Sequence, residues 1–270
     1  MEVFLADTLL VSIAIGEKYL DRYKTLFYGN HRAYADQCGY DLEVVADYLD
    51  PANRHPSFIS LQKSLVCSQE FSAGYKRIVY VDADILFNLR KADPIHLVVR
   101  DDTKVYIADE YTQPTPELRL RIQQACNWEA SAEEYYRLAG LELNTASVLN
   151  TGMMIFNPEA HRPLLEEIYR KTIATGYNHP RGFHYEQAMI GYGLQTAGCY
   201  RPLPNEWNAI WMLHKMGLGE GITLAEFFAA NKAVHFAGNY GLEEVPALLA
   251  ASGQNEPRSF GKKLLKALFR

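Results

Sequence analysis

Residues 77–87 read RIVYVDADILF, so an apolar run leads directly into two aspartates, Asp82 and Asp84, and then becomes apolar again. The pattern predicts a buried strand over residues 77–81. In an open α/β sheet, ligands gather at the carboxyl ends of strands, which is where the two aspartates stand. In extended chain their carboxylates point to the same side and can hold a hard divalent cation through oxygen atoms. Because burying two carboxylates without a partner is costly, this context favours a bound cation over two solvated acids in a turn.

The segments around this run alternate between strand-like and helix-like patterns. Strands are predicted at residues 9–15, 42–46, 77–81, 105–109, 148–156 and 232–236. Helices are predicted at residues 18–38, 57–71, 116–126, 132–139, 157–175 and 185–192. This order predicts an α/β fold with a mainly parallel sheet and helices on both faces. We expect one domain over residues 1–252 and a separate tail over residues 253–270.

The composition excludes several classes of protein. With 270 residues, 48% of them hydrophobic, the chain can bury a large core, so global disorder is not expected. The four cysteines are widely separated, which indicates neither a zinc cluster nor a disulfide framework and fits a reducing compartment. Residues 3–15 are apolar but contain Asp7 and lack a basic leader, so we interpret them as a strand and not a signal peptide. With no apolar run long enough to span a bilayer, a cytoplasmic protein is expected.

Charge is distributed unevenly along the chain. The whole sequence has 27 basic and 32 acidic residues, yet residues 258–270 (RSFGKKLLKALFR) contain five basic residues and no acidic one. The preceding body is therefore strongly acidic, which argues against a nucleic-acid binder. In the tail, apolar and basic residues fall on opposite sides at helical spacing, as in helices that lie on anionic membrane surfaces. A solvated or core-docked terminal helix is the alternative.

Two further positions carry candidate chemistry. Asn150-Thr151-Gly152 lies within a strand-like run, where a glycine permits close approach of the backbone to a ligand or marks a bulge. Asn150 offers both a donor and an acceptor, which suits sugar hydroxyls. His235 lies in the last predicted strand, where a buried core histidine is the simpler interpretation. If it joined two aspartates, the set would favour Mn²⁺-like ions over Ca²⁺ or Mg²⁺.

Taken in order, four short motifs resemble those of the GT-A-fold glycosyltransferases, which use nucleotide-sugar donors. The likeness is to families 8 and 34, which include galactosyl- and xylosyltransferases, and it covers residues 9–240 with few identities between motifs. YVDADILF resembles their metal-binding DxD motif, and LNTGMMIFNP at residues 149–158 resembles the strand that lines their donor and acceptor pocket. YEQA at residues 185–188 resembles their acidic-Gln pair, and HFAG at residues 235–238 resembles their late histidine motif.

The resemblance implies a Rossmann-like GT-A domain with a mixed, mainly parallel central sheet, and it implies roles for particular residues. Asp82, Asp84 and His235 would hold Mn²⁺ or Mg²⁺, and Glu186 and Gln187 would act beside the anomeric carbon. The implied donor-binding residues are Ala14, Ile15, Lys63, Asp82, Asn150, Thr151, Gly152 and Gly238. The candidate acceptor-binding residues are Trp207, Trp211 and Tyr240, for which a packing role is the alternative.

Two departures from the family pattern bear on these roles. Glu186 stands where the family more often has aspartate. HFAG is not followed by the family's Gly-x-x-Lys, so the positive partner of the diphosphate is expected to be Lys63, Lys215, Lys232 or the metal alone.

The resulting functional hypothesis is metal-dependent transfer of a sugar from a nucleotide donor, with UDP-hexose expected, to a glycan or lipid-linked acceptor hydroxyl. The resemblance favours retention of configuration. Such an enzyme would gain from a tail that binds an anionic membrane, which suggests a peripheral place on the inner face of the membrane. The alternatives are a catalytically inactive carbohydrate-binding module and a nucleotidyltransferase, although the Gly- and Lys/Arg-rich loop of the latter is missing after the first strand. An oxidoreductase is disfavoured because GxGxxG is absent there.

Overall fold

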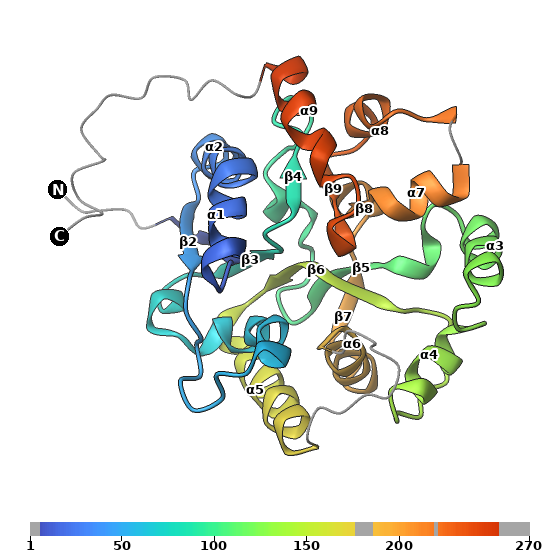
Figure 1. Ribbon diagram of the computed structural model, residues 1–270. Helices are drawn as coiled ribbons and strands as arrows, with labels where there is room; N and C mark the ends of the chain where they lie inside the picture. Colours follow the sequence, from blue (N-terminus) through green and yellow to red (C-terminus); the bar gives the residue numbers. More distant parts are fainter. Residues whose placement is uncertain (1–5, 176–185, 219–220, 254–270) are drawn as a thin grey trace, which may run out of the picture.

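The computed structural model describes residues 6–175, 186–218 and 221–253, and two sheets form its framework (Figure 1). The strands of the larger sheet are β1 (Thr8–Ile13), β2 (Asp41–Val45), β3 (Arg77–Val81), β5 (Val105–Asp109), β6 (Leu149–Phe156) and β7 (Tyr200–Pro202). They lie in the order β2-β1-β3-β6-β5-β7. The smaller sheet has the order β4-β9-β8, with β4 (Ile85–Phe87), β9 (Ala233–His235) and β8 (Ala209–Ile210). The six strands predicted from the sequence are confirmed within one or two residues at each end.

The larger sheet is mixed, as the resemblance implied. β1 pairs in parallel with β2 and β3, and β5 pairs in parallel with β7. β6 runs antiparallel to both of its neighbours, β3 and β5. Because β6 is reversed, its first residues lie at the edge of the sheet where β3 and β5 end. This edge is the one at which ligands are expected in such sheets.

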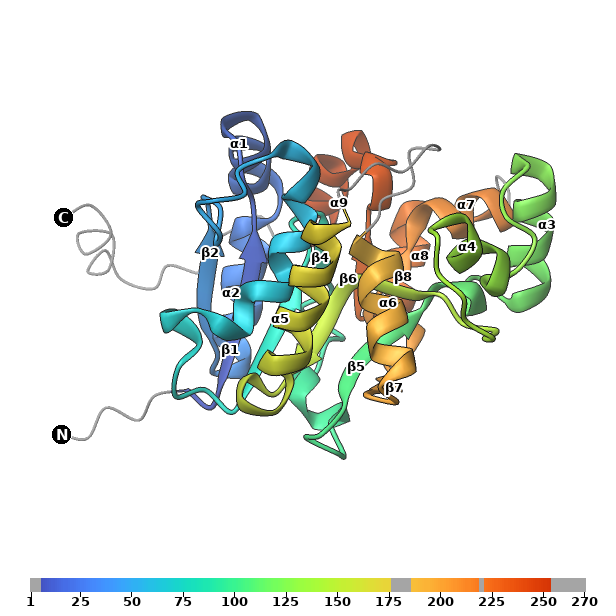
Figure 2. The same ribbon diagram turned by 90° about the horizontal axis from the view of Figure 1, so that it is seen from below.

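Helices cover the sheets and the end of the molecule away from β2 (Figure 1). The α-helices are α1 (Glu17–Leu26), α2 (Tyr28–Cys38), α3 (Pro116–Cys126), α4 (Ala132–Leu138), α5 (Pro158–Ala174), α6 (Glu186–Thr196), α7 (Trp211–Leu218), α8 (Leu224–Ala230) and α9 (Val245–Ser252). Seen from below, α5, α6 and a 3-10 helix at Ser60–Ser68 lie together over one face of the larger sheet (Figure 2). The helices α3, α4 and α7 lie at the end opposite β2 in both views.

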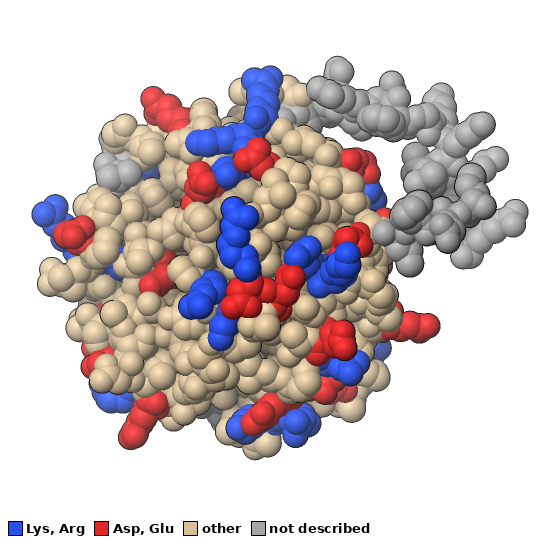
Figure 3. Space-filling view, turned by 180° about the vertical axis from the view of Figure 1, so that it is seen from behind, with Lys and Arg blue, Asp and Glu red and all other residues tan. Residues whose placement is uncertain are grey.

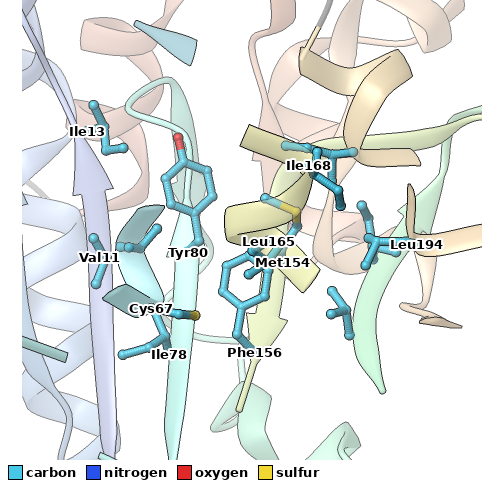
Figure 4. Packing of buried hydrophobic residues seen from close by; sticks show 14 of the residues in the cluster. Val11, Ile13, Cys67, Ile78, Tyr80, Met154, Phe156, Leu165, Ile168 and Leu194 are labelled. Carbon is cyan, nitrogen blue, oxygen red and sulfur yellow. The ribbon is translucent and has the colours of Figure 1, made fainter. Parts of the chain in front are cut away.

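Alternation along the strands divides the core between the two faces of the sheet. Val11 and Ile13 of β1 pack with Tyr80 of β3 in the cluster under α5 and α6, which Figure 4 shows from close by. Leu10 of β1 packs in the cluster on the other face, with Tyr34 of α2. All six residues of β1 are buried, because the strand is covered on both faces.

Two predicted helices differ from the expectation. The helix predicted at residues 18–38 is two helices, α1 and α2, that meet at Phe27. Phe27 leaves the helical conformation with φ −122°, and its side chain is fully buried in the core beside Phe236. The segment at residues 57–71 forms short 3-10 helices instead of an α-helix, and within it residues 61–67 are all buried. Packing on every side of this segment overrides the local helical preference.

Acidic and basic side chains are interspersed over the described residues on the face shown in Figure 3. In the part of the chain that the structure describes, no helix combines the length and the apolar character needed to cross a bilayer. The predicted amphipathic tail at residues 258–270 lies outside the described residues.

Candidate metal and donor-sugar site

The two sheets meet at the turn that carries the predicted metal ligands. Asp82 follows β3, and the carbonyl oxygen of Asp82 accepts a hydrogen bond from Ile85 N at 3.2 Å as the chain enters β4. Asp82 and Asp84 therefore lie in a turn and not in the extended chain that the sequence suggested. His235 pairs with Ile85 across the antiparallel β4–β9 ladder, which brings its ring beside the turn. The carboxylates and the imidazole thus converge from different sheets.

The three side chains are suitably arranged for a divalent cation. His235 Nε2 lies 3.4 Å from Asp84 Oδ1 and 4.0 Å from Asp82 Oδ2, and one ligand atom from each residue lies within 4.8 Å of the others. Asp84 Oδ1 is buried and accepts no hydrogen bond from the described residues. A buried carboxylate oxygen without a donor is a costly feature unless a cation satisfies it. The oxygen and nitrogen donor set fits Mn²⁺ or a similar ion.

The electrostatics of this group also indicate a missing positive charge. Burial raises the pKa of Asp82; Lys63 opposes this shift, Asp84 adds to it, and the net shift is upward. Burial lowers the pKa of His235, but the negative charges of Asp84 and Asp82 outweigh burial and raise it. His235 therefore holds a proton at higher pH than an ordinary histidine.

Gly152 lets the ring of His235 lie directly against β6. A Cβ at position 152 would stand 2.4 Å from His235 Cε1 and 2.9 Å from the side-chain oxygen of Asn150, both far inside contact distance. Residues 151–153 also form a bulge, because the pairing of β6 with β5 shifts between Ile107 and Ala108. The sequence offered close approach and a bulge as alternatives for this glycine, and both are present. The closely approaching group is a protein side chain.

Gly152→Ala should displace His235 and weaken Mn²⁺ binding by about 10–100-fold, the loss typical when the groups that orient a ligand are disturbed. The ring has little freedom to adjust, because it is buried and bonded to Asn208 at 2.9 Å. Mn²⁺ affinity can be measured from the signal of the free ion in electron paramagnetic resonance. The matched control is Gly29→Ala, since a Cβ at Gly29 in α2 meets nothing within 4 Å. Unchanged affinity in Gly152→Ala would contradict the ligand role of His235.

Lys63 is fully buried in the 3-10 helix below the turn, instead of facing an open donor pocket. Its ammonium lies 3.0 Å from Asp82 Oδ1 and 3.2 Å from Glu186 Oε1, and it donates to Thr151 O at 3.3 Å. Burial lowers the pKa of Lys63, but the charges of Asp82 and Glu186 outweigh burial and keep it raised. Lys63 therefore acts as the internal counter-ion of two acids.

Glu186 and Gln187 begin α6 and point into the same site. Glu186 is buried, and its Oε1 accepts hydrogen bonds from Lys63 and from Thr151 Oγ1 at 3.1 Å. Burial raises the pKa of Glu186, yet Lys63 and the hydrogen bonds lower it overall, so the carboxylate is ionised near neutral pH. Its second oxygen, Oε2, is buried and has no partner among the described residues.

The amide of Asn150 is occupied by protein groups. Its Nδ2 donates to Gln187 Oε1 at 3.1 Å and to Glu110 Oε2 at 3.0 Å. Its Oδ1 accepts from Gly152 N at 3.0 Å and from Asn208 Nδ2 at 2.8 Å. All four hydrogen-bonding positions of the amide are therefore filled. In this structure Asn150 organises its neighbours instead of presenting free groups to a sugar.

Two residues of this network, Glu110 and Arg119, were not identified from the sequence. Glu110 Oε2 also accepts from Gln187 Nε2 at 3.1 Å, and Glu110 Oε1 pairs at 3.0 Å with the buried Arg119 of α3. Glu110 directly follows the predicted strand at residues 105–109, as Asp82 follows the strand at 77–81. Searching for polar residues at strand ends would have found it. Arg119 gives no local signal, because it looks like an ordinary helix residue.

The remaining candidate donor residues are distributed along the same edge of the sheet. Ala14 and Ile15 follow β1, and both are buried. Tyr19 is half-buried nearby; burial and the charges of Asp84 and Asp82 raise its pKa, so its hydroxyl stays protonated. Gly238 follows β9 in an exposed turn with φ +67°, where a Cβ would meet nothing within 4 Å.

The other two lysines considered for the diphosphate have partners of their own. Lys232 pairs with Glu206 at 3.2 Å and with Asp93 at 3.4 Å. Lys215 of α7 lies over the ring of Trp211, with 5.7 Å between its Nζ and the ring centroid. Neither arrangement places a free ammonium beside the two aspartates of the turn.

The structure does not support the acceptor role expected for the two tryptophans. Trp207 and Trp211 are each 1% exposed, so neither ring can stack on a sugar. Trp207 packs in the core beside Tyr34, and Trp211 packs against Phe227. Both tryptophans therefore have the packing role that the sequence left open as the alternative to acceptor binding. Tyr240, the third candidate, is 41% exposed.

Comparison with solved structures supports the fold. The sequence matches no protein-family model and no curated protein. Among solved structures, it is similar to a glycosyltransferase involved in glycosylation of the major capsid of PBCV-1, at 14% identity and a TM-score of 0.56, over 90% of this chain and 98% of that one. It is also similar to the galactosyltransferase LgtC in complex with donor and acceptor sugar analogs, at 11% identity and a TM-score of 0.58, over 90% and 95% of the two chains.

A third match is the bifunctional glycosyltransferase WbbM, at 14% identity and a TM-score of 0.61. It covers 95% of this chain but only 51% of the WbbM chain. Identities this low establish a common architecture and leave activity to be argued from the site. From its sheet order and these matches, the chain has the GT-A fold of the nucleotide-sugar glycosyltransferases.

Proposed function

We propose that the protein is a metal-dependent glycosyltransferase that moves a hexose from a UDP-sugar to a hydroxyl group of a glycan or a lipid-linked saccharide. The observation that carries this proposal is the convergence of Asp82, Asp84 and His235 at the carboxyl edge of a GT-A sheet. One buried oxygen of Asp84 lies 3.4 Å from His235 Nε2 and accepts no hydrogen bond from the described residues. The similar LgtC structure contains donor and acceptor sugar analogs, which agrees with a sugar-transfer site in this architecture.

The residues of the turn would hold the donor's diphosphate through the cation. Asp82 is fixed by Tyr80, whose hydroxyl donates to Asp82 Oδ1 at 2.5 Å, and by Lys63. His235 is fixed by the β4–β9 ladder, and Asp84 is fixed by its carbonyl oxygen, which accepts a hydrogen bond from Phe236 N at 3.0 Å. When bound, a divalent cation would offset the negative charge that develops on the diphosphate as the glycosidic bond breaks. Rigid ligands of this kind need little reorganisation during the reaction.

Glu186 and Gln187 are our candidates for the groups that face the donor sugar. Gln187 is held by Asn150 and Glu110, so its amide has a fixed orientation. A glutamine also belongs to the active site of LgtC, since a matched structure is an active-site mutant in which glutamine is replaced by glutamate. Glu186 is ionised, and one of its oxygens has no hydrogen bond from a described residue, which suits contact with sugar hydroxyls or with developing positive charge.

We also propose which parts of the chain contact the acceptor and the membrane. Tyr240 is the exposed aromatic residue near the Gly238 turn and can present its ring to an acceptor sugar. The basic segment at residues 258–270 would hold the enzyme near an acceptor on an anionic membrane surface.

A panel of nucleotide sugars tests the proposed activity. We expect Mn²⁺-dependent release of UDP from one UDP-hexose, faster when the correct glycan is present, and loss of release in a chelator. Turnover that is unaffected by the chelator would overturn the metal dependence. Tight binding of a nucleotide sugar without any turnover, over a full acceptor panel, would show a binding module instead of an enzyme.

A further inference from the structure

Asn208 is a fully buried asparagine in the segment between Trp207 and β8. The main chain of the segment from Asn208 to Ile210 is held by Gln113, a residue that is itself fully buried. Gln113 Nε2 donates to Asn208 O at 3.0 Å, and Gln113 Oε1 accepts from Ile210 N at 2.9 Å. The backbone position of Asn208 is therefore fixed, and this fixes the point from which its side chain extends.

The side chain of Asn208 bridges two parts of the site. Its Nδ2 donates to Asn150 Oδ1 at 2.8 Å, and its Oδ1 lies 2.9 Å from His235 Nδ1. Asn150 in turn is bonded to Glu110, which pairs with Arg119. A continuous set of hydrogen bonds thus runs from a buried arginine to the imidazole of the metal site.

Two groups, one that can only donate a hydrogen bond and one that accepts, determine which atom donates and which accepts between Asn150, Asn208 and His235. The backbone N–H of Gly152 can only donate, and it donates to Asn150 Oδ1 at 3.0 Å. At the other end of the same amide, the carboxylate of Glu110, which pairs with Arg119, accepts hydrogen bonds, so it must face the NH₂ group of Asn150. The oxygen of Asn150 therefore points at Asn208 and requires a donor from it.

This requirement decides the orientation of Asn208 and, through it, the tautomer of His235. Asn208 must turn its NH₂ group to Asn150, which leaves its oxygen facing His235 Nδ1. An oxygen acceptor requires a proton on Nδ1. In the neutral ring the lone pair is then on Nε2, which is the nitrogen that lies near Asp84 and Asp82.

We propose that Asn208 is a positioning residue that keeps His235 in the Nδ1–H tautomer, so that Nε2 is available to a divalent cation. The inference rests on the metal site of the proposed function. Ligating histidines commonly donate their second N–H to an oxygen acceptor, which fixes the ring and raises its basicity. Here the acceptor is an amide whose own orientation is set by Gly152 and Glu110. The carboxylates near Nε2 favour a proton on that nitrogen, and Asn208 opposes this preference.

The tautomer can be observed without metal, donor or activity. In protein labelled with ¹⁵N at the imidazole nitrogens, the long-range proton–nitrogen NMR spectrum distinguishes Nδ1–H from Nε2–H. The spectrum is recorded at a pH where the ring is neutral, with His235→Gln to assign the signals. We expect the Nδ1–H form in the wild-type protein. A neutral His235 that carries its proton on Nε2 overturns the proposal.

Metal affinity provides the second readout. Asn208→Leu removes the acceptor and should weaken Mn²⁺ binding by about 10–100-fold in the absence of any nucleotide sugar. Asn208→Asp keeps an acceptor for His235 but presents a second acceptor to Asn150, so it should retain most of the wild-type affinity. If Asn208 were needed only for packing or for the bond to Asn150, Asn208→Asp would weaken Mn²⁺ binding as much as Asn208→Leu.

Two control variants distinguish the specific effect of Asn208 from the general effects of losing a polar group or adding a charge in the same segment. Asn205→Leu and Asn205→Asp change an asparagine of the same segment, whose amide donates to Thr112 Oγ1 at 2.8 Å, and they measure the effects of lost polarity and of added charge. Neither should change Mn²⁺ affinity. Wild-type affinity in Asn208→Leu, or equal losses in both Asn208 variants, overturns the proposal. If the expected order is found but no nucleotide sugar is turned over, the positioning role stands and the proposed function fails.

Discussion

Replacing Asp84 by asparagine is expected to abolish Mn²⁺ binding and to lower sugar transfer by about 10²–10³-fold or more, the range found when one group that stabilises developing charge is removed. The folded state should lose little. Asp84 Oδ1 accepts no hydrogen bond from the described residues, and its attraction to His235 Nε2 at 3.4 Å is opposed by the repulsion of the neighbouring Asp82 carboxylate. In the absence of metal, the free energy of unfolding of the variant should lie within about 1 kcal/mol of the wild-type value. Transfer rate, Mn²⁺ affinity and urea unfolding together check this expectation.

The control for Asp84 is another aspartate that pairs weakly at the surface. Asp93→Asn loses only an exposed ion pair with Lys232, 3.4 Å away, and should leave transfer and metal affinity unchanged. Full transfer by Asp84→Asn would remove the metal from the proposed mechanism. A large loss of stability in the same variant would mean that Asp84 has a structural role that its geometry does not show.

The largest effect on stability is expected at Lys63. Lys63→Met leaves the carboxylates of Asp82 and Glu186 without their buried counter-ion, and breaking such a pair typically costs about 3–5 kcal/mol. In the wild type, the lowered pKa of Glu186 contributes stability above its unfolded pKa, and this contribution is lost as the pH falls through the folded pKa. In Lys63→Met the sign should reverse, because an unpaired buried carboxylate is relieved by protonation. Urea unfolding from pH 8 down to below pH 4.5, the ordinary pKa of a glutamate, measures both changes.

A double variant and a surface control sharpen this test. Lys63→Met/Glu186→Gln removes one of the two unpaired charges and should recover part of the lost stability. Lys76→Met removes an exposed ion pair with Asp7 and should leave the free energy of unfolding nearly unchanged, because solvent screens this pair. If the two lysine variants were equally stable, Lys63 would not be the internal counter-ion that its contacts indicate.

Local pattern in the sequence predicts the strands and the position of the acids, because both depend on neighbouring residues. The run at residues 77–81 forms β3 with the predicted bounds, and the aspartates follow at the sheet edge. His235 could be placed beside them only through the resemblance to a family. Its approach depends on the β4–β9 ladder and on the absence of a Cβ at Gly152, and both are long-range features.

The errors at the level of side chains have the same physical origin. Lys63, Trp207 and Trp211 have types that suit contact with a phosphate or a sugar, but all three are buried by segments distant in the chain. The exposure of a side chain depends on tertiary packing, which cannot be inferred from the neighbouring residues in the sequence. Asn208 was missed for the same reason, since its significance lies in the directions of its hydrogen bonds and not in its neighbours in the sequence.

The burial of Lys63 beneath the acidic turn has a consequence for how the chain emerges from the ribosome. Lys63 precedes Asp82 by 19 residues, so it has already been synthesised when the first aspartate appears. His235 is made much later, near the end of the described chain. A nascent chain therefore carries the lysine that pairs with the acidic turn long before it carries His235. A metal ion held by Asp82, Asp84 and His235 together could be bound only after His235 is made and the β4–β9 ladder has formed.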